Sequence, residues 1–178
     1  MFYSSTDGQY IYDGQQFTIG GITYPSNWLN NSTAEEKAAI GLEEVVATNA
    51  PADQTYYWVT PEYNGASLTY VNTPKDLTSV KTNAISTVNN TAYTILFPTD
   101  WMVVKAFETS TTVPNAWNTW RASIRTTATS TVSAIEAASD VPAVQTIMGN
   151  IAWAADPDQV AAQLAAEAEA APTKKASK

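Results

Sequence analysis

Apolar side chains in the second half of the chain recur every three or four residues, which is the spacing of amphipathic helices. Residues 96–125 hold two prolines, Pro98 and Pro114, each at or just before a predicted first helical turn, where the missing N–H costs little. This segment therefore predicts a helix, a short connector and a second helix. The first helix carries Trp101, Val104 and Lys105 at one-turn spacing. The second carries an apolar stripe at Trp117, Trp120, Ile124, Ala128, Val132 and Ile135.

Three further helix starts are predicted in this half, each where a capping side chain stands just before a proline. They lie at Thr73-Pro74, Asp140-Val141-Pro142 and Asp156-Pro157. The helix after Thr73 repeats its apolar residues at Leu77, Val80, Ala84, Ile85, Val88 and Ile95. The last helix is rich in alanine, which favours helix but buries little area, so we expect a marginal helix. A frayed basic end should follow it, with Lys174, Lys175 and Lys178.

The first seventy or so residues show the two-residue alternation of β-strands instead. Residues 16–24 alternate apolar and polar side chains on both sides of Gly20-Gly21, which predicts a hairpin with a two-residue turn. Ser32 and Glu35 have the spacing of a capping box, so a short helix should follow and end near Gly41.

Further strands are predicted at residues 42–46, 55–59 and 67–71. Asn64-Gly65 marks a tight turn between the last two, and Pro61 marks a sheet edge or an interruption. The predicted class is therefore α+β: a small N-terminal antiparallel sheet with one short helix, then a helical hairpin packed through its tryptophans, then further helices. The three regions are residues 1–72, 73–155 and 156–178.

Aromatic residues crowd the two strands around the Asn64-Gly65 turn. They are Tyr56, Tyr57, Trp58, Tyr63 and Tyr70. Because neighbouring side chains of a strand point to opposite faces, these rings cannot all enter one core, and some must face outward. An exposed apolar patch usually marks a protein contact, with Tyr57, Trp58 and Tyr70 as candidate contact residues. Coverage of the sheet by the helical half is the alternative interpretation, and carbohydrates also stack on such rings.

Arg121 and Arg125 are four residues apart on the second predicted helix, so they lie on one helical face beside the tryptophan stripe. Such a pair binds either a neighbouring acid, here Asp100 or Glu108, or phosphate or the carboxylate of a partner. The commoner arrangement pairs the arginines with the neighbouring acid while their stems cover tryptophan. Arg121, Arg125 and Trp101 are nevertheless retained as candidate partner-binding residues.

The 178-residue chain contains no cysteine and no histidine. These absences remove disulfides, thiolate metal sites and the Ser-His-Asp and Cys-His nucleophile systems, so an enzyme would have to use carboxylate or lysine chemistry, for example on glycans. No catalytic residue, metal site or cofactor is predicted. Close acidic pairs such as Asp156 and Asp158 lack a partner base or a third ligand nearby in the sequence. They are better explained by helix N-termini and solvated faces.

Nine basic and seventeen acidic residues give a formal net charge of −8. A surface of this sign repels phosphate backbones, which argues against nucleic-acid binding. The N-terminus lacks a basic start followed by an apolar core, and no apolar run approaches the ~20 residues that span a bilayer. We therefore expect no membrane association and a protein that stays in the compartment where it is made.

Two blocks of the sequence resemble a known family. The later block reads L-x-P-T-D-W-M-V-V-K-A-x-E-T from Leu96 and V-P-x-x-W-x-x-W-R-x-x-I-R from Val113. The earlier block reads F-T-I-G-G-I-T-Y-P-S-N-W-L from Phe17 and S-T-A-E-E-K-A-A-I-G-L from Ser32. Together they are similar to tail-fibre assembly proteins of tailed bacteriophages and to small fibre-region proteins of cyanophages. Ser110 stands where that family often has glycine.

The resemblance implies a role in fibre folding or attachment and no catalysis. The expected partner is a phage tail-fibre protein or another tail subunit, whose apolar surface or unpaired strands would be covered while the fibre trimerises. A permanent structural part of the tail or fibre base is the alternative. The first role places the protein in the host cytoplasm during phage assembly, and the second places it in the virion tail. Self-association of the chain is left open.

Overall fold

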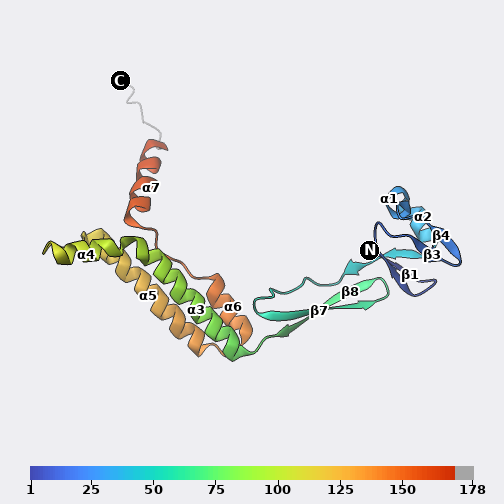
Figure 1. The fold of residues 1–178 in the computed structure, drawn as a ribbon, viewed down its shortest axis with the longest axis horizontal. Helices are drawn as coiled ribbons and strands as arrows, with labels where there is room; N and C mark the ends of the chain where they lie inside the picture. The colour runs from blue at the N-terminus through green and yellow to red at the C-terminus, as the bar shows by residue number, and fades with distance from the viewer. Residues whose placement is uncertain (171–178) are drawn as a thin grey trace, which may run out of the picture. The chain divides into compact units, whose positions relative to one another are not determined.

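The computed structural model describes residues 1–170 and consists of two compact units, Met1–Lys75 and Asp76–Lys178 (Figure 1). The predicted basic end, with its three lysines, lies outside the described residues. The α+β class is confirmed, because small sheets with two short helices form the first unit and helices form the second. Each unit has its own apolar interior.

Two of the sheets in the first unit share one core. Strands β1 (Phe2–Ser4), β2 (Gln9–Ile11) and β5 (Leu42–Glu44) form an antiparallel sheet in the order β2-β1-β5. Strands β3 (Phe17–Ile19) and β4 (Ile22–Tyr24) form the predicted hairpin, with positive φ at both turn glycines. The core consists of Ile11, Phe17, Ile19, Leu29 and Leu42. Sequence periodicity missed β1 and β2, because three-residue strands are too short to show it.

The short helix of this unit begins one residue later than predicted. A helical turn, α1 (Trp28–Asn31), precedes α2 (Ala34–Ala39). Ser32 cannot cap α2, because its hydroxyl donates to the carbonyl of Trp28 at 2.6 Å and ends α1. Thr33 is the N-cap instead, and it forms the capping box with Glu36.

The third sheet contains the aromatic strands. Strands β6 (Val46–Ala47), β7 (Tyr57–Asn64) and β8 (Ser67–Pro74) have the order β6-β8-β7. The sequence predicts that Pro61 marks a sheet edge or an interruption, and the structure shows the edge, because β7 is an edge strand. The Lys75 N–H donates to the Tyr56 carbonyl at 2.9 Å, and hydrogen-bonded pairs alternate along the ladder, so the missing N–H of Pro61 faces away from β8.

The helix predicted at Thr73-Pro74 starts later, because β8 continues through Pro74. Asp76 is the N-cap of α3 (Leu77–Leu96), and its carboxylate accepts the Ser79 N–H at 2.8 Å. Thr73 pairs with Trp58 in the β7–β8 ladder, so it does not cap the helix. The cap is Asp76, which lies beyond the end of the ladder.

The second unit is built on α3 and α5 (Asn115–Ala137), which lie side by side, with α6 (Val141–Gly149) against both (Figure 1). Between them come a 3₁₀ turn, η1 (Phe97–Thr99), and α4 (Asp100–Glu108), so the predicted helix, connector and helix are present. The principal neighbour of α5 is nevertheless α3 rather than α4. The tryptophan-packed hairpin of α4 and α5 is therefore corrected: the interior is mainly aliphatic, with Val88, Ile124, Ile135 and Val144, and it also includes Trp120 of α5.

The last described helix is α7 (Pro157–Ala170). The segment before it, which includes Ala154 and Ala155, lies against the first turns of α5. The first turn of α7 is capped by Asp156, whose carboxylate accepts the Gln159 N–H at 2.8 Å, as the Asp156-Pro157 motif predicts. Within residues 1–170, each helix is too short or too polar to cross a bilayer.

Candidate functional site

Helix α4 begins on an anchor that α5 provides. The guanidinium of Arg121 is buried, and its Nη1 donates to the carbonyl of Leu96 at 3.0 Å and to the hydroxyl of Thr99. Its Nη2 lies 2.6 Å from Oδ1 of Asp100, the first residue of α4. One side chain therefore ties the end of α3, the 3₁₀ turn and the start of α4 to α5.

The other end of α4 is closed by a Schellman motif. The Thr111 N–H donates to the Ala106 carbonyl at 3.0 Å, and the Ser110 N–H donates to the Phe107 carbonyl at 3.4 Å. Ser110 has a φ of 53°, and it is the one non-glycine residue among the described positions with a positive φ. This left-handed residue turns the connector back along α4 toward the start of α5.

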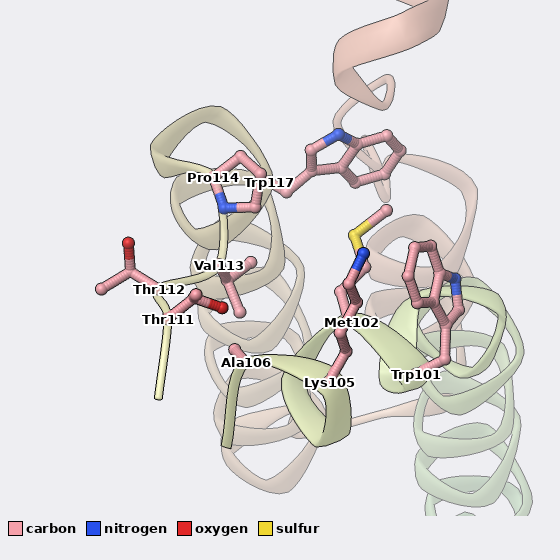
Figure 2. A pocket seen from close by; sticks show the side chains of 9 residues that line it. All are labelled: Trp101, Met102, Lys105, Ala106, Thr111, Thr112, Val113, Pro114 and Trp117. Atoms are coloured by element: carbon pink, nitrogen blue, oxygen red, sulfur yellow. The ribbon is translucent and has the colours of Figure 1, made fainter. Parts of the chain in front are cut away.

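A pocket of about 220 Å³ lies between α4, the connector and the start of α5. Its lining consists of Trp101, Met102, Lys105, Ala106, Thr111, Thr112, Val113, Pro114 and Trp117. Figure 2 shows Met102 and Lys105 extending from α4 toward Trp117 of α5. The lining is mainly apolar, and Lys105 is its one charged residue.

Most of the apolar side chains of α4 are exposed. Phe107 is 86% exposed and Trp101 is 56% exposed. No residue of α4 is buried. The term α4 surface is used below for Phe97, Trp101, Val103, Val104 and Phe107, which are all exposed. A helix that is apolar around most of its circumference is ordinarily buried, so exposure of this one indicates a surface that another molecule covers.

A second hollow adjoins the first. It has a volume of about 540 Å³ and is lined in part by Trp117, Trp120 and Trp153. The Trp120 indole donates to the Ala154 carbonyl at 2.9 Å, and its ring lies edge-on to that of Trp117 at 5.5 Å. Because Trp117 lines both hollows, it forms a wall between them, and this end of the helical unit is apolar over a wide area.

The structure separates the aromatic strand residues that the sequence groups together. Register places Tyr57 and Tyr70 on one face of the β7–β8 hairpin and Trp58 on the other. Trp58 is 65% exposed, and the Lys75 ammonium lies 4.6 Å from its ring centroid. These three residues belong to the first unit, whereas Trp101, Arg121 and Arg125 belong to the second.

The two arginines have different surroundings although they lie on one helix. Arg121 is buried and paired with Asp100, which is the neighbouring-acid arrangement expected from the sequence. Arg125 is exposed, and within residues 1–170 it makes no ion pair. Arg121 therefore positions α4, while Arg125 remains available at the surface.

Sequence reasoning missed Phe97, Val103 and Phe107. The signal was present, because the run from Trp101 to Phe107 leaves apolar residues on more than one side of a helix. The sequence predicts α4 as an amphipathic helix with one side facing the core. This interpretation leaves the apolar residues on its other sides unexplained. The pocket itself depends on the backward turn at Ser110, which sequence periodicity does not report.

Among residues 1–170, no three acidic side chains are grouped so that they would hold a metal ion. No family model, curated protein or solved structure matches the chain. The likeness to tail-fibre assembly proteins therefore rests on the motifs described above, and the function that it implies stays a prediction.

Proposed function

We propose that this protein binds another polypeptide through the α4 surface, without catalysis, and that the partner is a phage tail-fibre protein during fibre assembly. The observation that carries this proposal is the exposure of five large apolar side chains within residues 97–107, one on the 3₁₀ turn and four on α4, which has no buried residue. The resemblance in residues 96–125 concerns the same segment, and it supplies the identity of the partner.

The anchoring of α4 supports binding rather than disorder. An apolar helix without buried residues has little hydrophobic stabilisation of its own. Arg121 compensates by holding both the preceding turn and Asp100, so the apolar side chains are presented on a fixed helix. A surface that is ordered before it meets its partner loses less conformational entropy on binding.

The expected strength of binding suits an assembly factor. Burial of one large apolar side chain stabilises a complex by roughly 1.5–3 kcal/mol. Four such residues, Phe97, Trp101, Val104 and Phe107, would together contribute roughly 6–12 kcal/mol. Association itself costs about 4–15 kcal/mol. The α4 surface alone therefore favours a reversible complex, which can release the fibre once its strands are paired.

Composition agrees with a role that involves no catalysis. The chain lacks the imidazole and thiol groups on which most acid/base and nucleophilic systems depend. The net charge of −8 keeps a protein with an exposed apolar surface soluble and disfavours contact with nucleic acid.

The test is co-expression of a tail-fibre polypeptide with the wild-type protein, with Phe107→Ser or with Leu164→Ser. Phe107 is exposed, so serine should remove a contact without unfolding the helix. Leu164 is also exposed but lies on α7, and it serves as the matched control. We expect the wild type and Leu164→Ser to increase the yield of soluble fibre trimer and Phe107→Ser to lose that effect. Equal trimer yield with and without the wild-type protein would contradict the proposal.

A permanent structural role is the second candidate, and α7 favours it. Every described side chain from Asp158 to Glu167 is exposed, including Val160 and Leu164. A helix that is solvated on all sides is often ordered by a neighbouring subunit. Mass spectrometry of purified virions distinguishes the two roles, because a structural subunit is recovered in stoichiometric amounts and an assembly factor is absent.

A further inference from the structure

The pocket beside α4 has the size of a site for one side chain. Pockets that hold small-molecule ligands usually measure about 300–1,000 Å³. The pocket formed by Trp101, Met102, Trp117 and their neighbours measures about 220 Å³. It is therefore too small for a cofactor, and it is large enough for an aliphatic side chain of a bound polypeptide.

The walls favour an apolar side chain. Two indole rings stand on opposite elements, Trp101 on α4 and Trp117 on α5, and Met102 projects between them (Figure 2). Methionine is flexible and polarizable, so it adapts to side chains of different shape. Val113 and Pro114 complete an apolar wall on the connector side.

One charge lies at this apolar site, and it is positive. The Lys105 ammonium lies 5.7 Å from the centroid of the Trp101 ring, and this cation–π contact leaves its N–H groups able to donate to a ligand. Within residues 1–170 the one ion pair joins Arg121 to Asp100, so the nearest acid at the start of α4 is already paired. Glu108, one turn after Lys105, makes no ion pair with any of the described residues.

This combination indicates the chemistry of the occupant. A cationic ligand is disfavoured because Lys105 would repel it, even though two indoles resemble the walls of an aromatic cage. A purely apolar ligand would leave the ammonium without a partner at the interface. A carboxylate beside an aliphatic side chain satisfies both features, because the aliphatic group enters the pocket and the carboxylate reaches Lys105.

We infer that the pocket between α4 and α5 recognises a short polypeptide segment in which an aliphatic side chain is followed by an acidic residue. This inference rests on the proposed function, and it specifies which part of a partner polypeptide the α4 surface binds. The exposed members of the α4 surface then flank the pocket and cover apolar residues on either side of the recognised pair.

The experiment uses the full chain labelled with ¹⁵N and follows the indole N–H signals of Trp101 and Trp117. The probe is the peptide acetyl-Gly-Ser-Leu-Asp-Ser-Gly-amide at millimolar concentration. Comparison peptides replace its aspartate by asparagine or lysine, or its leucine by serine. We expect both indole signals to shift with the leucine-aspartate peptide. The asparagine peptide should bind about twofold to fivefold more weakly, which is the ratio that an exposed ion pair supplies.

Two variants isolate the charge. Lys105→Met should remove the preference for aspartate over asparagine and leave binding of the leucine intact. Lys81→Met removes the same charge from α3, where Lys81 donates to the Glu136 carbonyl, and it should keep the preference. Equal binding of all the peptides, or the absence of shifts at both indoles, would overturn the inference.

The outcomes separate this inference from the proposed function. If the wild-type protein increases fibre trimer yield but the pocket does not distinguish the peptides, the fibre role stands and the inference fails. If the pocket selects the leucine-aspartate peptide and fibre yield is unaffected, peptide recognition stands and the fibre role fails.

Discussion

The guanidinium of Arg121 lies 2.6 Å from the carboxylate of Asp100, and the two residues differ sharply in exposure. The Arg121 side chain is 6% exposed and that of Asp100 is 50% exposed. The cation is therefore almost fully removed from water, while its counter-charge still contacts solvent. Because Arg121 also donates to Leu96 and Thr99, this pair holds the element that carries the proposed binding surface.

Removal of the Asp100 carboxylate should destabilise the helical unit. Asp100→Ala leaves the buried Arg121 without a counter-charge, so we expect the free energy of unfolding to fall by about 1–3 kcal/mol. Urea unfolding followed by far-UV circular dichroism measures this change. Arg121→Met removes the charge together with its need for a partner. The double variant should therefore be less destabilised than the sum of the two single variants, and strict additivity would contradict a direct coupling.

The elements that the sequence predicted well are those with long, regular periodicity. The stripe from Trp117 to Ile135 spans several turns, and it forms the buried face of α5, apart from the partly buried Trp117 and Val132. The hairpin at Gly20-Gly21 was likewise predictable, because few other residue pairs fit a turn with positive φ at both positions. In both cases local preference and tertiary packing favour the same conformation.

Two of the predictions that were wrong concern competition between neighbouring polar groups. Ser32 and Thr33 are both good caps, and the choice between them depends on the bond from Ser32 to Trp28, which closes the preceding turn. Thr73 has the sequence environment of a cap, but the strand pairing of β8 extends past it. The pocket was not predictable, because it arises from the path of the connector after Ser110.

Replacement of Ser110 by glycine should stabilise the protein. Ser110 adopts a φ of 53° at the position of a Schellman motif where glycine is usual, and a left-handed conformation costs a residue with a side chain about 1–2 kcal/mol. Glycine also loses more chain entropy on folding, so we expect a net gain of about 0.5–1 kcal/mol for Ser110→Gly. Thermal melting measures the gain. Ser110→Ala is the control, and it should show no gain because it retains the left-handed strain.

Substitution of Gly41 should destabilise the first unit by a different mechanism. Gly41 follows α2 with a φ of 75°, and an added Cβ would lie 2.7 Å from the Thr6 hydroxyl. Gly14 has a similar φ of 78° but open space around it, so Gly14→Ala reports the cost of the conformation alone. We expect Gly41→Ala to be the more destabilising, by roughly 1 kcal/mol or more beyond Gly14→Ala. Urea unfolding compares them, and Thr6→Ala should recover part of the difference.

The cap of α3 should make stability depend on pH in a defined window. The hydrogen bond from the Ser79 backbone N–H, with a second from its hydroxyl, lowers the pKa of Asp76 below its ordinary value of 3.8. A carboxylate whose pKa is lowered by folding stabilises the folded state above the unfolded pKa, and this contribution is lost as the pH falls through the folded pKa.

Asp76→Asn keeps a capping oxygen at every pH but does not titrate. We therefore expect wild type and variant to differ most in melting temperature at about pH 6, and the difference to narrow as the pH falls toward about 3. Asp76→Ala should be the least stable of the three at about pH 6, because it leaves the Ser79 N–H without its acceptor. Thermal melting by circular dichroism across this interval makes the comparison. A constant difference between wild type and Asp76→Asn would show that the charge of Asp76 contributes nothing to the cap.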